Sequence, residues 1–146
     1  MCIRDRIEGG YTGRMQSAGG PVMEALLEKG VVPVISPVAM GEEAEPLNVD
    51  SDRAAAYMAM GTHADSIVFL TDVKGLLMDG KVVEKLTAEQ ARTYLPKIGF
   101  GMQKKILAAI EVIEAGVGEG IIASGFGPTP LTNALMHRDC TVMTKQ

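Results

Sequence analysis

The sequence predicts an α/β fold in which helices cover both faces of a mostly parallel sheet. Apolar runs rich in β-branched residues alternate along the chain with helical segments. These runs are continuously apolar, which is typical of parallel strands buried on both faces. The chain has 146 residues, of which 47% are hydrophobic and 22% charged, so it is long enough for one domain with a sizeable core.

The first elements are set by glycine, proline and apolar runs. Gly20-Pro21 starts a helix over 22–29, and Gly30 ends it. The next segments are expected to be a buried strand at 31–40, a polar loop or small hairpin at 41–48, and an alanine-rich helix at 51–60 that Gly61 closes.

The later elements follow the same alternation. Thr87 is a predicted helix cap, and Ile106, Ile110 and Ile113 form one face of a longer helix. The expected order is a buried strand at 65–72, a turn at 72–81, helices at 87–95 and 102–116 separated by 96–101, a strand at 118–125, a helix at 128–136 and a strand at 140–144.

Composition excludes several classes of protein. The formal charge of −4 argues against a broad nucleic-acid surface, and no apolar run approaches the roughly 18 residues of a membrane span. Cys2 and Cys140 are the only cysteines, and no ligand set for a metal is expected. His63 and His137 are isolated and expected at the surface. We therefore expect a cytoplasmic protein without nucleic-acid or membrane partners.

Three polar residues stand together at the start of the alanine-rich helix: Asn48, Asp50 and Asp52. One helix cap needs one side chain, and Asp50 is the better candidate for it. Asn48 can both donate and accept hydrogen bonds and suits a polar substrate, whereas Asp52 could hold lysine ammonium groups. The alternative for all three is capping and solvation.

Two later segments could bind a nucleotide. Thr71, Asp72 and Gly75 follow a strand, where ligands of parallel sheets bind, although a tight turn is the alternative. Gly99 precedes a helix whose first turns carry Lys104 and Lys105. A helix N-terminus favours anions, and lysines there oppose the helix dipole, which suggests an anionic ligand; the alternative is a solvated lysine pair. Neither a Walker sequence nor a dinucleotide fingerprint is present.

The order of three motifs resembles the C-terminal part of acetylglutamate kinases in the amino acid kinase family. The motifs are "PVISPVAMGEEAEPLNVDSD", "SIVFLTDVKGLLMDGKVVEKLT" and "GFGMQKKILAAIEVIEAGV". Together with "IEGGYTGRM", they are most similar to the branch that acts on glutamate or 2-aminoadipate bound to a small acidic amino-group carrier protein. The resemblance covers residues 7–146 and implies a three-layer αβα sandwich.

The resemblance also implies an activity and the residues that serve it. ATP with Mg²⁺ would phosphorylate a side-chain carboxylate to an acyl phosphate. Lys105 would stabilise the transferred phosphoryl group, Asp52 would organise catalytic lysines, and Asn48 would contact the substrate. No residue is expected to be a metal ligand. The expected nucleotide-binding residues are Thr71, Asp72, Val73, Gly75, Leu76, Ile98, Gly99 and Met102.

The start of the chain departs from the family pattern. The family's first strand, with its lysine and glycine pairs, is not recognisable, and residues 1–6 are expected to be foreign to the fold. Residues 1–146 are therefore expected to be the nucleotide-binding portion of a larger, homo-oligomeric kinase, inactive alone. Two alternatives stay open: an N-acetylglutamate kinase of arginine synthesis, and a non-catalytic nucleotide-binding module.

Overall fold

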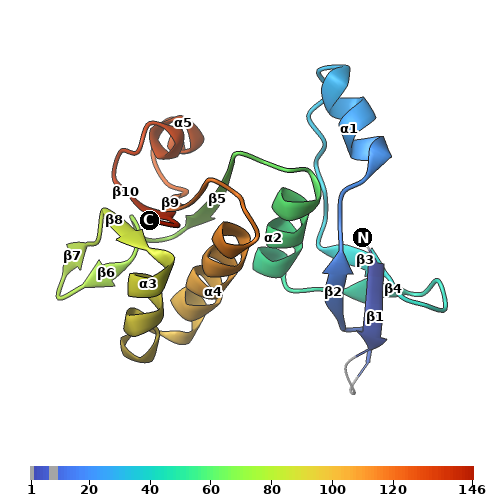
Figure 1. Ribbon diagram of the computed structural model, residues 1–146, viewed down its shortest axis with the longest axis horizontal. Helices are drawn as coiled ribbons and strands as arrows, with labels where there is room; N and C mark the ends of the chain where they lie inside the picture. The colour runs from blue at the N-terminus through green and yellow to red at the C-terminus, as the bar shows by residue number, and fades with distance from the viewer. Residues whose placement is uncertain (1, 7–9) are drawn as a thin grey trace. The chain divides into compact units, whose positions relative to one another are not determined.

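The computed structural model describes residues 2–6 and 10–146, with side chains from residue 10 onward (Figure 1). The chain forms two compact units, Met1–Ala64 and Asp65–Gln146. Each unit has its own four-stranded sheet.

The first unit contains a four-stranded sheet with the order β2-β1-β3-β4. The strands β1–β2 and β3–β4 pair antiparallel, and β1 pairs parallel with β3. Leu47 and Val49, which flank the end of β4, form a buried cluster with residues of the sheet and of α2. The elements are β1 (Cys2–Arg6), β2 (Gly13–Ser17), α1 (Pro21–Glu28), β3 (Val38–Met40), β4 (Pro46–Asn48) and α2 (Ser51–Gly61).

Gly61 is the last residue of α2, and close packing requires a glycine there. A Cβ atom on Gly61 would overlap the carbonyl oxygen of Ala18, on the segment that follows β2. Only glycine allows the helix end and this segment to approach so closely. The glycine predicted to close the helix therefore also joins α2 to the sheet's flank.

Two sequence expectations for the first unit are wrong. Only β3, at the end of the predicted strand 31–40, is extended into the sheet, and the side chains of Val32 and Val34 are 82% and 97% exposed. Pro33 and Pro37 lack the N–H groups that pairing in a sheet needs. The hydrophobicity of residues 31–40 alone therefore gave a wrong prediction of a buried strand. No strand was expected in the first 17 residues, yet β1 and β2 form an antiparallel pair there.

The described residues near the N-terminus are 2–6 and those from 10 onward. Residue 1 and residues 7–9, which begin the "IEGGYTGRM" motif, lie outside the described residues. Residues 2–6 form β1 and pair with both β2 and β3. That these first residues are foreign to the fold stays a prediction.

The second unit is a three-layer αβα structure around a four-stranded sheet with the order β5-β9-β10-β8 (Figure 1). The pairs β5–β9 and β10–β8 are parallel, and β9–β10 is antiparallel. The predicted mostly parallel α/β architecture is confirmed. The elements are β5 (Ser66–Thr71), β6 (Leu77–Met78), β7 (Lys81–Val82), β8 (Lys85–Thr87), α3 (Ala88–Tyr94), η1 (Leu95–Lys97), α4 (Phe100–Glu114), β9 (Glu119–Ser124), α5 (Pro130–Leu135) and β10 (Cys140–Thr144).

Strand β9 shows how both faces of this sheet are covered. Gly120 faces α4, since a Cβ atom there would lie 3.2 Å from the Cβ of Ala109. Ile121 and Ala123 point the other way and pack with Ala134 of α5. Successive residues of a strand face opposite sides, so a continuously apolar strand is buried from both.

The helix signals of the sequence are confirmed. Thr87 caps α3 in a capping box with Gln90, in which each side chain bonds the other residue's backbone N–H. Ile106, Ile110 and Ile113 are fully buried along one face of α4. These signals depend only on residues within one or two helical turns, which is why they can be read locally.

Candidate functional site

The second unit gathers several chain segments at one edge of its sheet. Thr71 and Ser124, the last residues of β5 and β9, lie opposite each other in register. The carbonyl of Thr71 accepts a hydrogen bond from the N–H of Gly125 at 2.7 Å. Because β10 is antiparallel to β9, its first residue, Cys140, lies beside Ala123 at the same edge. Ligands of α/β sheets bind outside this kind of edge.

The loop after β5 carries most of the predicted nucleotide-binding residues. The Thr71 hydroxyl donates to the Asp72 carboxylate at 3.0 Å, and Asp72 is exposed and Val73 half-buried. Gly75 and Leu76 are buried, and the Leu76 side chain is fully removed from solvent. The first part of the loop can therefore face a ligand, whereas its end packs into the protein.

The second predicted nucleotide segment is the start of α4. Gly99 is the N-cap, and among the described residues no side chain caps this end of the helix. The Gln103 amide donates to the carbonyls of Leu95 and Ile98 at 2.9 and 3.0 Å, which ties the preceding turn to the helix. Met102 is half-buried. The first turn contains no acidic residue, so its N–H groups and positive dipole end suit an anion.

The two lysines near this helix start have different surroundings. Lys104 is exposed, and its Nζ lies 5.0 Å from the centre of the Phe100 ring, a cation–π contact. Lys105 is half-buried. The geometry thus gives Lys104 a local role on its own helix and distinguishes it from Lys105, the predicted catalytic lysine.

The predicted substrate residues lie in the first unit. Asn48 is exposed, and its backbone N–H donates to the carbonyl of Tyr11 at 2.8 Å. Thr12 forms a parallel bridge with Asn48. The structure therefore brings Asn48 together with the described part of the "IEGGYTGRM" motif, which the sequence left as two separate segments.

Asp50 and Asp52 divide the polar roles at the start of α2. The Asp50 carboxylate accepts hydrogen bonds from the N–H groups of Asp52 and Arg53, so Asp50 is the N-cap, as predicted. Asp52 lies in the first turn of the helix and is half-buried. Its charge also suits the helix dipole at this end.

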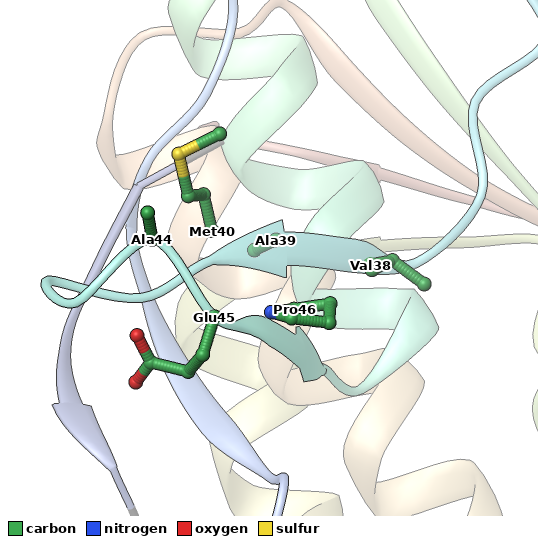
Figure 2. A pocket seen from close by; sticks show the side chains of 6 residues that line it. All are labelled: Val38, Ala39, Met40, Ala44, Glu45 and Pro46. Carbon is green, nitrogen blue, oxygen red and sulfur yellow. The ribbon is translucent and has the colours of Figure 1, made fainter.

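The hairpin β3–β4 also borders an open pocket of about 310 Å³ (Figure 2). Its lining is mostly apolar, with the carboxylate of Glu45 as its charged group. Glu45 also accepts a hydrogen bond from the N–H of Glu43 at 2.9 Å, so it shapes the hairpin turn. None of the predicted site residues lines this pocket, which is formed by Val38, Ala39, Met40, Ala44, Glu45 and Pro46.

Within residues 2–6 and 10–146, no group of three or more His, Cys, Asp or Glu side chains is arranged to hold a metal ion. In the same part of the chain, no helix has the length and apolar character needed to cross a membrane.

Comparison with known proteins identifies the family. The sequence pattern of the amino acid kinase family matches residues 2–124. The chain belongs to the amino acid kinase family. A protein of Cenarchaeum symbiosum (strain A), provisionally named a LysW-aminoadipate/LysW-glutamate kinase, is 53% identical over 140 residues, which are 96% of this chain and 53% of that protein. The LysW-aminoadipate/LysW-glutamate kinase of Sulfurisphaera tokodaii is 42% identical over 138 residues, or 94% of this chain and 53% of that protein.

Solved structures share the fold of this chain. The protein smu.665 of Streptococcus mutans UA159 superposes on 99% of this chain with a TM-score of 0.82 and 27% identity, and 57% of that protein is covered. N-acetylglutamate synthase of Neisseria gonorrhoeae superposes on 97% of this chain with a TM-score of 0.88, at 24% identity and with 35% of that protein covered. The second likeness shows the fold alone. This amino acid kinase chain spans about half the length of the curated relatives it matches.

Proposed function

We propose that this chain is part of a kinase that transfers the γ-phosphoryl group of ATP to the side-chain carboxylate of 2-aminoadipate or glutamate. The amino acid would be bound through its amino group to a small acidic carrier protein. The observation that carries this proposal is the 53% identity over 140 residues to a relative named for that substrate pair. The same name at 42% identity supports it.

The chemistry requires little from the protein beyond alignment and charge. A carboxylate is ionised at neutral pH, so the reaction needs no general base. Transfer of the phosphoryl group depends on holding donor and acceptor in line and on cancelling the charge that develops. Lysine side chains, helix N–H groups and the Mg²⁺ that enters with ATP supply that charge.

The residues of this chain would share the work in a specific way. Thr71, Asp72 and the N-terminus of α4 would hold the nucleotide, since they combine a strand-end loop with a helix N-terminus. Lys105 would stabilise the transferred group. Asp52 would orient lysine ammonium groups, and Asn48 would bind the amino acid. Mg²⁺ would be carried by the ATP phosphates as part of the substrate.

Hydroxylamine trapping of the acyl phosphate tests this proposal. An extended form would join this chain to the part of the Cenarchaeum symbiosum relative that lies outside the match. We expect turnover of carrier-linked aminoadipate or glutamate by the extended form, and none by the 146-residue chain alone. Efficient use of free N-acetylglutamate would favour an arginine-pathway kinase instead. Nucleotide binding without turnover of any of these substrates would favour a non-catalytic module.

A further inference from the structure

We infer that Thr141 is a positioning residue for the nucleotide, acting through the loop that follows β5. This inference rests on the proposed function, which assigns Thr71 and Asp72 of that loop to ATP. Thr141 is the second residue of β10 and is fully buried. The sequence gives no signal for this role, because Thr141 stands within a short apolar strand and threonine is common in strands.

A buried hydrogen bond joins Thr141 to the end of the loop. The Thr141 hydroxyl oxygen accepts from the backbone N–H of Leu76 at 2.8 Å, and the carbonyl of Leu76 accepts from the N–H of Val83 at 2.8 Å. Both backbone groups of Leu76 are therefore held, and its side chain is fully buried. The N–H, the carbonyl and the side chain of Leu76 are therefore all held in place. The ligand-facing part of the loop, which includes Thr71 and Asp72, precedes this fixed residue.

At Gly75 the loop also comes very close to the backbone of β10. A Cβ atom on Gly75 would collide with the Thr141 hydroxyl and would lie 2.9 Å from its backbone nitrogen. No residue other than glycine fits there without moving the loop or the strand. The loop and the start of β10 are thus packed at backbone contact distance.

A second contact sets the alignment of the two segments. The Lys74 ammonium lies 3.2 Å from the Asp139 carboxylate, two residues before the Leu76–Thr141 bond on each segment. Residues 74–76 therefore run alongside 139–141 in the same direction. Both side chains of the ion pair are more than half exposed, so it contributes little to stability. The buried bond dominates, because removing the acceptor leaves an N–H group without a partner away from water.

Thr141→Val tests the inference, since valine keeps the shape and removes the acceptor. We expect amide hydrogen exchange at Leu76 to become at least about tenfold faster, and ATP affinity of the 146-residue chain, titrated with Mg²⁺, to fall on the order of tenfold. Thr141→Ser keeps the hydroxyl and should restore both. Gly75→Ala perturbs the same contact from the loop, because the new Cβ would collide with Thr141. It should weaken ATP binding even if Thr141→Val folds poorly.

Val142→Ala is the matched control. Val142 is also buried in β10 but packs against Ile121 and Ala134 on the face of α5. Its truncation should lower stability while leaving Leu76 exchange and ATP affinity near the wild-type values. A general loss of stability in β10 would instead change both variants alike.

The outcomes separate the two claims. Unchanged Leu76 exchange in Thr141→Val, or faster exchange with unchanged ATP affinity, would overturn the positioning role while the proposed function stands. ATP affinity that falls equally in Val142→Ala would also overturn it. A wild-type 146-residue chain that binds no ATP would overturn this inference, whereas the proposed function is decided separately by turnover in the extended form.

Discussion

Asp50 caps the helix that carries Asp52: the Asp50 Oδ1 accepts the backbone N–H of Asp52 at 3.1 Å. The same oxygen accepts from the N–H of Arg53 at 3.2 Å. The Asp50 carboxylate therefore accepts from two of the N–H groups that lack a partner within the helix. The Asp52 carboxylate does not act as this cap, so a different role is expected for it.

The first prediction concerns the cap. Asp50→Ala should lower the free energy of unfolding by about 1 kcal/mol, because two N–H groups lose their acceptor. Asp50→Asn should change it by only a few tenths of a kcal/mol, since asparagine is about as good a cap. Urea denaturation measures both variants. A loss in Asp50→Asn as large as that in Asp50→Ala would mean that the negative charge, rather than the acceptor, matters.

The second prediction concerns Asp52 as the residue that orients lysines. Asp52→Asn keeps the shape and removes the charge, so the extended form should lose kcat at least about tenfold while its unfolding free energy changes by less than about 0.5 kcal/mol. Steady-state kinetics beside circular dichroism measure the two effects. Full activity in Asp52→Asn would contradict a catalytic role for its charge.

The third prediction separates the two lysines of α4. Lys105→Ala in the extended form should lower kcat far more than it raises the KM for ATP, by about 2.7–4 kcal/mol of transition-state stabilisation. Lys104→Ala is the matched control, one residue away. It removes the cation–π contact with Phe100, which is worth about 0.5–1 kcal/mol at an exposed site. An inactive Lys104→Ala beside an active Lys105→Ala would reverse the assignment.

The fourth prediction concerns the carrier. Tyr11, whose carbonyl accepts the N–H of Asn48, is 66% exposed, and Arg14 of β2 in the same unit is also exposed. An acidic carrier would be attracted to basic side chains there, although the chain itself has a net charge of −4. Added salt should therefore raise the KM for the carrier-linked substrate and barely change the KM for ATP. Arg14→Gln should reduce this salt dependence, and an unchanged salt response in that variant would exclude Arg14 from carrier binding.

The fifth prediction concerns Cys140. Burial raises the pKa of its thiol above the ordinary value, and the negative charges of Asp139, Glu119 and Glu84 add to the effect. The folded state therefore holds the proton more tightly than the unfolded state. This contribution is complete below about pH 8 and is lost above about pH 8.5, with a slope of at most about 1.36 kcal/mol per pH unit.

Cys140→Ala supplies the comparison for this prediction. Between about pH 8.5 and 10, the free energy of unfolding of the wild type should fall more steeply than that of Cys140→Ala. Parallel slopes would contradict it. In a Cys2→Ala background, the Cys140 thiol should also react with thiol reagents only as fast as the protein unfolds, because it is 3% exposed.

The family motifs and the helix signals were readable from the sequence. The Asp50 cap, the capping box of Thr87 and the isoleucine face of α4 all involve residues within a few positions of one another. Such signals can be predicted from the sequence, because the residues that form a cap or a helical face lie within one or two turns of one another. In the second unit β5, α3, α4, β9, α5 and β10 followed from the same local patterns, whereas the short strands β6, β7 and β8 were not predicted.

The burial of residues 31–40 and the direction of β10 could not be predicted from local sequence patterns. The apolar run 31–40 reads as a buried strand, yet Val34 is 97% exposed, because burial depends on what covers a segment and prolines limit its pairing. The antiparallel direction of β10 places Thr141 beside Leu76, 65 positions earlier in the chain. The sequence by itself determined the family, the caps and the amphipathic faces. The tertiary structure alone decided which side chains meet across the sheet edge, because those contacts depend on partners far away in the sequence.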